Sequence, residues 1–341
     1  MFLTHIWYFG LLSSSLKPGH MVSKRIAGEP ILFLRTKDHR VFALRDICPH
    51  RGMPLSCGRL LNTEEVECCY HGWRFNTHGA CTKIPSLTSD QDFDLSRIQV
   101  QTYPCFEKSG TLWIYLSSEK NPKPSFLPDL PSNLPASPRL ALTMTFPCNI
   151  DHAVIGLMDP AHGPFIHRSW FWRTRVSMHE KEKAFEPIPL GFKMTRHTPS
   201  KNARAYKILG SAPQTEISFM LPGIRLETID IGKHHVWGLT TLTPRDEHTS
   251  EITHMIYWTT PGLTFFKALL YPFVYTFLNQ DRKAIIQQQK GLQYNPSLLL
   301  IKDADTQAKW YYKIKKEYQT SAEQGKPFIN PLKPAHLKWK S

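Results

Sequence analysis

Apolar and polar residues alternate in short runs over the first third of the chain. Runs at 31–34, 41–44 and 112–116 are separated by glycine and proline, which is typical of strands joined by tight turns. The apolar segment 1–12 lacks the basic start of a signal peptide, so it is interpreted as a further strand. The pattern predicts a small all-β domain over residues 1–120.

A proline-rich segment follows this domain. Residues 121–139 contain six prolines, a density that excludes regular secondary structure and is typical of a stiff linker. Beyond it, residues 190–260 alternate in strand-like pieces, whereas helical patterns run from about 265 past 289 and from 303 to about 318. The sequence therefore predicts a second domain, of the α+β type, over residues 140–341.

The longest apolar run, 263–278, is too short to cross a membrane. It has 16 residues and is interrupted by Lys267 and Pro272, whereas a spanning helix needs about 20 apolar residues. Two interpretations of this run stay open. It forms a helix of the core, or it presents an interfacial face to a membrane, and the second case favours a lipid, sterol or pigment substrate.

The net charge of +14 is concentrated in two segments. Residues 168–207 carry ten Lys/Arg against three acids, and residues 302–341 carry nine against four. Such surfaces attract an acidic protein partner, a phospholipid surface or an anionic substrate, and charge does not choose among them. No nucleic-acid motif accompanies the charge, so no nucleic-acid partner is expected.

The seven cysteines all lie in the first 150 residues. An odd and crowded set favours a metal site over the disulfide framework of a secreted protein. We therefore expect a reducing compartment and a cytoplasmic location, with peripheral membrane contact as the alternative that the run 263–278 leaves open.

Two segments near the cysteines each supply one thiol and one imidazole. The first holds Cys48 and His50. The second holds Cys68 and His71, and 17 residues separate His50 from Cys68. In a [2Fe-2S] cluster of this composition, two cysteines hold one iron and two histidines hold the other. Cys68 is preferred to its neighbour Cys69 because its spacing lets it face the same cluster as His71. Two cysteines and two histidines also bind zinc, so this alternative stays open.

A second candidate site lies in the segment 159–167. His162 and His167 are separated by four residues, which lets both face one metal. A facial triad for iron(II) needs one carboxylate in addition, and it leaves other positions open for O2 and substrate. The best candidate is Asp281, in the predicted helix, whereas Asp230 and Asp246 fall near strand-like segments and turns.

These motifs resemble those of the Rieske non-heme iron oxygenases. The strings CPHRG and CCYHGW resemble the Rieske motif, and DPAHGPFIH resembles the iron motif of the α subunits, similar to pheophorbide a oxygenase and O-demethylases. The surroundings of Asp281 are similar to the helix that supplies the third ligand. Respiratory Rieske proteins have extra cysteines where this chain has Met53 and Tyr70, so the oxygenase type is favoured. The family often has Glu-Asn where this chain has Ile155-Gly156, which puts the water network around the iron in doubt.

The resemblance implies a fold and a set of cofactors. The expected fold is α+β, with an N-terminal all-β Rieske domain followed by a C-terminal helix-grip (START-like) catalytic domain. One [2Fe-2S] cluster and one mononuclear Fe(II) are implied per chain, in a head-to-tail homotrimer. The ligands implied are Cys48, His50, Cys68 and His71 for the cluster and His162, His167 and Asp281 for the iron. Asp159 is implied to carry electrons from His71 of one chain to His162 of the next.

The resemblance also implies an activity. It is the use of O2 to hydroxylate, demethylate or desaturate an apolar small molecule that is aromatic, sterol-like or pigment-like. No dinucleotide-binding fingerprint or ferredoxin cysteine set is present, so the electrons are expected from a separate ferredoxin or reductase. The alternative is a Rieske electron-transfer protein with an inactive second domain. Six residues suggest an apolar pocket, although core packing explains them equally well: Phe192, Phe219, Met220, Trp237, Tyr257 and Trp258.

Overall fold

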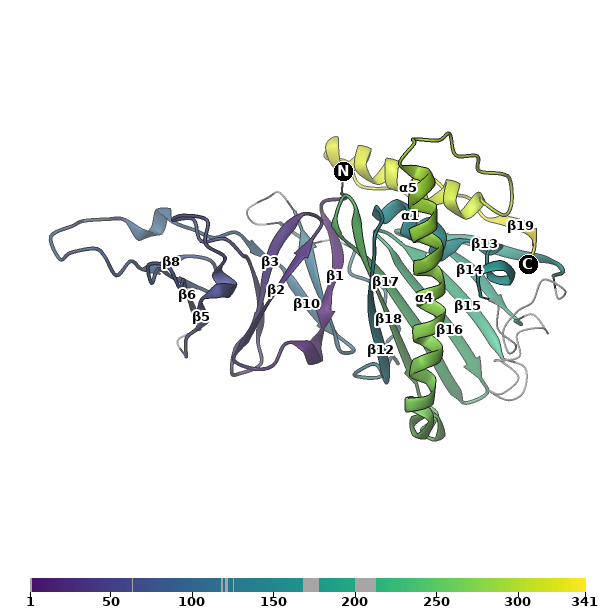
Figure 1. The fold of residues 1–341 in the computed structure, drawn as a ribbon, viewed down its shortest axis with the longest axis horizontal. Coiled ribbons are helices and arrows are strands. Elements are labelled where there is room, and N and C mark those ends of the chain that lie inside the picture. The colour runs from purple at the N-terminus through teal and green to yellow at the C-terminus, as the bar shows by residue number, and fades with distance from the viewer. Residues whose placement is uncertain are drawn as a thin grey trace. The chain divides into compact units, whose positions relative to one another are not determined.

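The chain folds into two compact units, residues 2–128 and residues 129–341. The computed structural model (Figure 1) describes residues 2–62, 64–117, 119, 122–124, 126–167, 178–199 and 213–341. The described part of the first unit holds strands and short 3-10 turns, and the second unit combines a sheet with helices. The predicted α+β class is therefore confirmed.

The N-terminal unit contains three antiparallel sheets. Their strand orders are β1-β11-β10, β2-β3-β4-β9 and β5-β6-β7-β8. The predicted runs at 31–34, 41–44 and 112–116 fall on strands, and the strand predicted over 1–12 is found at 6–12. The bounds are β1 Ile6–Leu12, β2 His20–Ile26, β3 Glu29–Arg35, β4 Val41–Arg45, β5 Arg59–Leu60, β6 Glu65–Glu67, β7 Arg74–Asn76, β8 Cys81–Lys83, β9 Thr102–Tyr103, β10 Cys105–Lys108 and β11 Thr111–Leu116.

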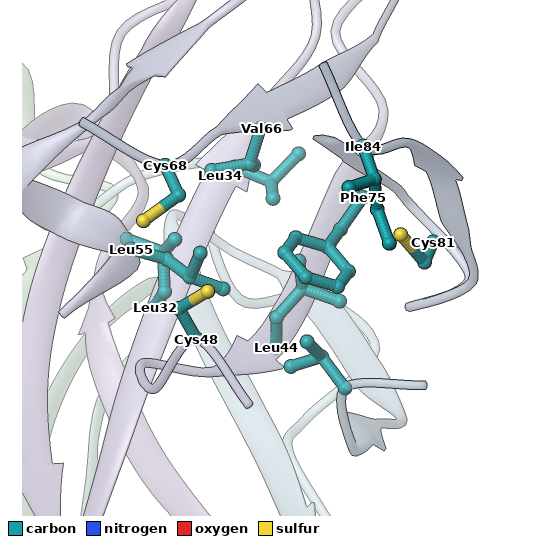
Figure 2. Packing of buried hydrophobic residues seen from close by; sticks show 11 residues of the cluster. Leu32, Leu34, Leu44, Cys48, Leu55, Val66, Cys68, Phe75, Cys81 and Ile84 are labelled. Atoms are coloured by element: carbon teal, nitrogen blue, oxygen red, sulfur yellow. The ribbon is translucent and has the colours of Figure 1, made fainter. Parts of the chain in front are cut away.

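One apolar cluster of this unit joins two of its sheets. Leu32 and Leu44 face each other across β3 and β4, and Val66 and Phe75 do so across β6 and β7. These four side chains are at most 1% exposed. Figure 2 shows the sulfur atoms of Cys48 and Cys68 at one end of the cluster, on either side of Leu55. The two loops that carry candidate ligands thus pack against a buried apolar core.

The second unit is built on an eight-stranded antiparallel sheet. Its order is β12-β18-β17-β16-β15-β14-β13-β19, so the last strand of the chain forms one edge. The strands are β12 Leu140–Phe146, β13 Glu180–Ile188, β14 Gly191–His197, β15 Gln214–Met220, β16 Ile224–Ile231, β17 His234–Asp246, β18 Thr249–Trp258 and β19 Ala335–Lys340. The helical elements are α1 Ile150–Met158, α2 Gly163–Ile166, η5 Pro261–Phe266, α4 Lys267–Leu292 and α5 Thr306–Glu323.

Helices cover one face of this sheet (Figure 1). Trp310 of α5 lies 5.2 Å, between ring centroids, from Phe192, and Tyr311 lies 6.0 Å from Phe219. All six apolar residues that suggested a pocket in the sequence are less than 9% exposed: Phe192, Phe219, Met220, Trp237, Tyr257 and Trp258. They belong to the core of the unit, because they fill the space within and around the sheet.

The two long predicted helices are confirmed as α4 and α5. The first half of α4, however, is more exposed than a helix of the core would be. Only Leu278 and Ile285 of this helix are buried. Six large apolar side chains of η5 and the first half of α4 are between 37% and 89% exposed: Phe265, Leu269, Tyr271, Phe273, Tyr275 and Phe277. The interpretation of 263–278 as a core helix is therefore wrong. No helix in the described part of the chain is long and apolar enough to span a membrane.

We expect Phe75→Ala to destabilise the N-terminal unit. The Phe75 ring is 0% exposed, so its removal leaves a cavity and lowers the free energy of unfolding by about 3–5 kcal/mol. Hydrogen exchange of the β6 and β7 amides under increasing urea measures this unit by itself. The control, Phe93→Ala, removes a ring that is 50% exposed and changes the free energy by no more than about 0.5 kcal/mol. Equal effects of the two substitutions would contradict the packing described above.

Candidate metal centres

The loops that carry Cys48 and Cys68 have the same backbone design. In the first, the N–H of Cys48 donates to Met53 at 2.8 Å and the N–H of Gly52 donates to Cys48 at 2.9 Å. In the second, Cys68 donates to Trp73 at 2.8 Å and Gly72 donates to Cys68 at 3.0 Å. Both glycines have positive φ, 71° and 69°, a conformation that costs glycine little. Each loop is therefore closed by its own hydrogen bonds.

The imidazoles of the two loops lie beside each other. The ring centroids of His50 and His71 are 4.5 Å apart, and the indole of Trp73 stacks on His50 at 4.5 Å and 4°. The Nε1 atom of Trp73 is buried and makes no hydrogen bond with a described residue. Burial, with the positive charges of His71 and Arg51, lowers the pKa of His50 and favours the neutral ring that a metal requires.

The two thiols also form a pair. Burial raises the pKa of the Cys48 thiol to about 11, a shift that the backbone N–H of His50 opposes and the neighbouring Cys68 increases. Both thiols are buried and free of disulfides. Thiols bind metal only after they lose their protons and become thiolates, so metal binding here is coupled to proton release.

The two loops fit a cluster better than a single ion. The four donor residues do not converge, because among the described residues only His162, His167 and Asp281 place their ligand atoms within 4.8 Å of one another. A tetrahedral zinc site brings all four ligands to one point. One pair of interacting thiols and one pair of neighbouring imidazoles suit a cluster in which each pair holds its own iron.

The structure brings His162, His167 and Asp281 together at the second candidate site. The Nε2 atoms of the two histidines are 3.1 Å apart, and Oδ1 of Asp281 lies 3.2 Å from the Nε2 of His167 and 3.6 Å from that of His162. His162 precedes α2 and His167 follows it, whereas Asp281 lies within α4. Two imidazoles and one carboxylate facing one point form the donor set of an iron(II) facial triad.

Neighbouring side chains orient the two histidines. Gln280 accepts a hydrogen bond at 3.0 Å from Nδ1 of His167, which leaves Nε2 free to bind a metal. The ring of Phe277 stacks on His167 at 3.7 Å and 11°. The sequence assigned neither residue a role, although Phe277 lies four residues before Asp281 on a predicted helix, a spacing that places the two on the same side of it.

Asp159 lies beside His162. Its Oδ2 atom is 3.6 Å from Nδ1 of His162, beyond hydrogen-bond distance, and that buried Nδ1 has no partner among the described residues. Burial disfavours the charged imidazole, but the carboxylates of Asp159 and Asp281 outweigh this effect and raise the pKa of His162. The pocket therefore favours positive charge at this ring.

A cavity of about 420 Å³ adjoins the triad. Its wall includes His162 and Asp281, and most of the remaining side chains that line it are apolar, among them Phe146, Ile252 and Ile285. His152 of α1 also lines it, and its buried Nδ1 makes no hydrogen bond with a described residue. None of the six apolar residues singled out in the sequence lines this cavity.

The alternative carboxylates lie elsewhere. Asp230 pairs with Arg196 at 2.7 Å and with Nδ1 of His235 at 2.7 Å. Asp246 ends β17 and accepts a hydrogen bond at 3.0 Å from the N–H of His248. Neither carboxylate joins the group formed by the two iron-ligand candidates and Asp281.

Comparison with known proteins identifies two domains. Residues 6–104 match the Rieske [2Fe-2S] domain, and residues 147–312 match the vanillate O-demethylase oxygenase C-terminal domain. In the crystal structure of dicamba monooxygenase bound to dicamba, the same fold is found with a TM-score of 0.72 and 22% sequence identity, over 94% of this chain and 99% of that one.

The curated proteins that are similar to this chain include a chlorophyllide a oxygenase and a methylsterol monooxygenase. Chlorophyllide a oxygenase of Oryza sativa subsp. japonica is 32% identical over 173 residues, which are 50% of this chain and 30% of that protein. The 4beta-methylsterol monooxygenase of Methylococcus capsulatus is 25% identical over 309 residues, 85% of this chain and 81% of that protein. The match thus spans less than a third of the length of the chlorophyllide a oxygenases.

We expect Asp281→Asn to weaken metal binding at the triad. The amide carries no charge and is a poorer ligand than the carboxylate. Loss of a residue that only hydrogen-bonds to a ligand lowers metal affinity by up to roughly 100-fold, and we expect the loss of a direct ligand to lower the affinity for Fe(II) by more than that. Anaerobic calorimetric titration with Fe(II) measures this change. Asp246→Asn is the matched control and leaves the affinity unchanged. A similar loss in both variants would refute the assignment of Asp281.

Proposed function

Because this chain belongs to the Rieske non-heme iron oxygenases, we propose that it is an oxygenase that uses O2 and externally supplied electrons to modify an apolar small molecule. The observation that carries the proposal is the convergence of His162, His167 and Asp281 beside a largely apolar cavity. The reaction is a hydroxylation, a demethylation or a desaturation. The names of the relatives, which refer to chlorophyllide, a methylsterol and dicamba, support an aromatic, sterol-like or pigment-like substrate.

The proposed cofactors have separate ligands. Cys48, His50, Cys68 and His71 hold the [2Fe-2S] cluster, and His162, His167 and Asp281 hold the mononuclear iron. When bound, this iron supplies the activation of O2 with electrons that the cluster relays. We assign the cluster to a domain over 1–120 and the iron to a domain over 140–341, with 121–139 as the linker.

The protein residues around the iron site have distinct tasks in this proposal. Gln280 and Phe277 hold His167 in one orientation, and Asp159 fixes the ring of His162 through its charge. The apolar wall of the cavity excludes water and holds the apolar body of the substrate. In a head-to-tail homotrimer, Asp159 also joins His162 to the cluster ligand His71 of the neighbouring chain.

The electron donor is a separate ferredoxin or reductase. The acidic surface of such a protein is complementary to the basic segment 302–341. In the other basic segment, 168–207, residues 168–177 and 200–207 lie outside the described residues. The competing proposal, an electron carrier with an inactive second domain, requires that the triad bind no iron, and the 3.2 Å approach of Asp281 to His167 favours the oxygenase.

Counting iron separates the two functions. After anaerobic reconstitution we expect about three irons per chain, from the cluster and the triad together, and about two for a carrier. His162→Ala lowers the count by about one and abolishes substrate-dependent O2 consumption, because one of the triad's ligands is lost. The Rieske absorption and electron resonance signals stay unchanged. Loss of these signals in the variant would contradict the separation of the two sites, and a count of two in the unmodified protein would support the carrier.

We also propose that the exposed half of α4 contacts a membrane surface. The 20 residues from Pro261 to Gln280 contain one cation, Lys267, and no acid, so the exposed aromatic side chains lie in a segment that anionic lipids do not repel. Tyrosine, phenylalanine and lysine on one exposed helix are typical of helices that lie in the membrane interface.

We expect the protein to sediment with phosphatidylcholine vesicles that contain phosphatidylglycerol. The double substitution Phe265→Ser and Leu269→Ser removes side chains that are 89% and 62% exposed, and it weakens binding by at least about tenfold. Ile329→Ser, at a side chain that is 77% exposed outside α4, is the control and leaves binding unchanged. Absence of binding, or equal binding by the three proteins, would exclude the membrane contact.

A further inference from the structure

Three adjacent strands carry a row of polar side chains on one face of the catalytic sheet. Arg225 of β16 pairs in register with Thr240 of β17, and Thr240 pairs with His254 of β18. In the next row of the same face, Glu227 pairs with Gly238. Partners in register place their side chains side by side on the same face.

This face is the one that the helices cover. Phe219, the register partner of Arg225 on β15, packs against Tyr311 of α5. Ile252 lies two residues before His254 on β18 and lines the cavity that also contains His162 and Asp281. Two residues of a strand span about 7 Å, so the polar row begins one step along the sheet from the cavity.

Hydrogen bonds connect the side chains of the row, but some of their nitrogen atoms have no hydrogen-bond partner among the described residues. Nδ1 of His254 is 2.7 Å from the hydroxyl of Thr240, and Nη2 of Arg225 donates to Glu227 at 3.1 Å. Within the described part of the chain, Nε2 of His254 and the other guanidinium nitrogens of Arg225 have no hydrogen-bond partner. These donors are therefore open to a further hydrogen-bond acceptor.

The row has no net charge. Burial lowers the pKa of His254 to about 4, and the positive charge of Arg225 adds to this shift while Glu227 opposes it. The imidazole is therefore neutral at physiological pH, and Arg225 and Glu227 cancel each other. When the Thr240 hydroxyl donates to Nδ1, the neutral ring carries its proton on Nε2 and offers it as a donor.

Space remains beside these donors. The side chains of Arg225 and Glu227 keep 22% and 18% of their accessible surface on a face that helices cover, so a small molecule can reach them. Gly238 leaves room for both side chains, because a Cβ atom there would already be in van der Waals contact with them, 3.5 Å from Cε1 of His254 and 3.9 Å from Cβ of Glu227. A larger side chain at this position would occupy the region in front of His254.

We propose that Arg225, Thr240 and His254 form a subsite that orients the substrate by donating hydrogen bonds to a neutral oxygen atom, such as a carbonyl or hydroxyl oxygen, on an otherwise apolar molecule. This inference rests on the proposed oxygenase function and names the substrate feature that the site selects. A carboxylate would disturb the charge balance of Arg225 and Glu227. A pure hydrocarbon would displace water from these donors and leave them unpaired, which costs free energy.

The test uses two fluorescent probes of nearly the same shape. One is the ketone 6-propionyl-2-(dimethylamino)naphthalene, and the other is its 6-propyl analogue, which lacks the oxygen. We expect the reconstituted protein to bind the ketone about tenfold more tightly, since one well-made hydrogen bond in a buried site is worth about that factor. The emission of the ketone also reports whether its carbonyl accepts a hydrogen bond.

Substitutions test whether Arg225, Thr240 and His254 cause the tighter binding of the ketone. His254→Phe abolishes the tenfold preference and the hydrogen-bonded emission, while the 6-propyl probe still binds. His254→Gln, which keeps an N–H donor, restores part of the preference. Gly238→Leu fills the space and weakens both probes. His235→Phe is the control, because His235 lies on the opposite face of β17 from Thr240, and it leaves the preference unchanged.

The outcomes separate this inference from the proposed function. Equal affinities of the two probes, no binding of either, or a preference that survives in His254→Phe would overturn the subsite. None of these results changes the iron count or the effect of His162→Ala, which test the oxygenase itself. An unchanged iron content and melting temperature of His254→Phe show that the variant is folded.

Discussion

The structure of the catalytic unit depends on holding one carboxylate against two imidazoles. Asp281 comes from a long helix, and the histidines flank a short one, so the helices must keep a fixed mutual position. Asp151 of α1 accepts hydrogen bonds from Tyr311 at 2.6 Å and Lys315 at 2.5 Å, which ties α1 to α5. Arg282, next to Asp281, donates to the backbone of Thr145 at 3.0 Å and ties α4 to the edge strand β12. The sheet and helices thus form a frame around the three candidate ligand atoms.

The two candidate centres differ in how local they are, and this explains what the sequence could predict. Each cluster loop is closed by hydrogen bonds within six residues, so the short spacing between Cys48 and His50 was sufficient to propose both as cluster ligands. The carboxylate of the triad is distant in sequence from its partners. Its choice over Asp230 and Asp246 rested on resemblance, and only the packing of α4 places Asp281 beside His167.

Periodicity predicted the helices α4 and α5, the strands β1, β3, β4 and β11, and the strand-rich region 190–260, but it did not predict which faces of these elements are covered by other parts of the chain. Aromatic residues are equally common in a core, a pocket wall and an exposed face, and for that reason the burial of Trp237 and the exposure of Phe265 could not be distinguished in the sequence. The polar row of the sheet could not be predicted from the sequence either. Arg225, Thr240 and His254 become neighbours only through the register of three strands.

The paired loops have a consequence for the rate of electron transfer. Because each loop is held by its own backbone hydrogen bonds and rests on the packed core, its atoms have little freedom to move when the charge between the loops changes by one electron. A site that shifts little between two charge states has a small reorganisation energy, in the same way that fixed dipoles reduce the barrier of a reaction. The rigidity of these turns therefore favours fast electron exchange in both directions, and the direction of flow is left to the difference in potential between the partners.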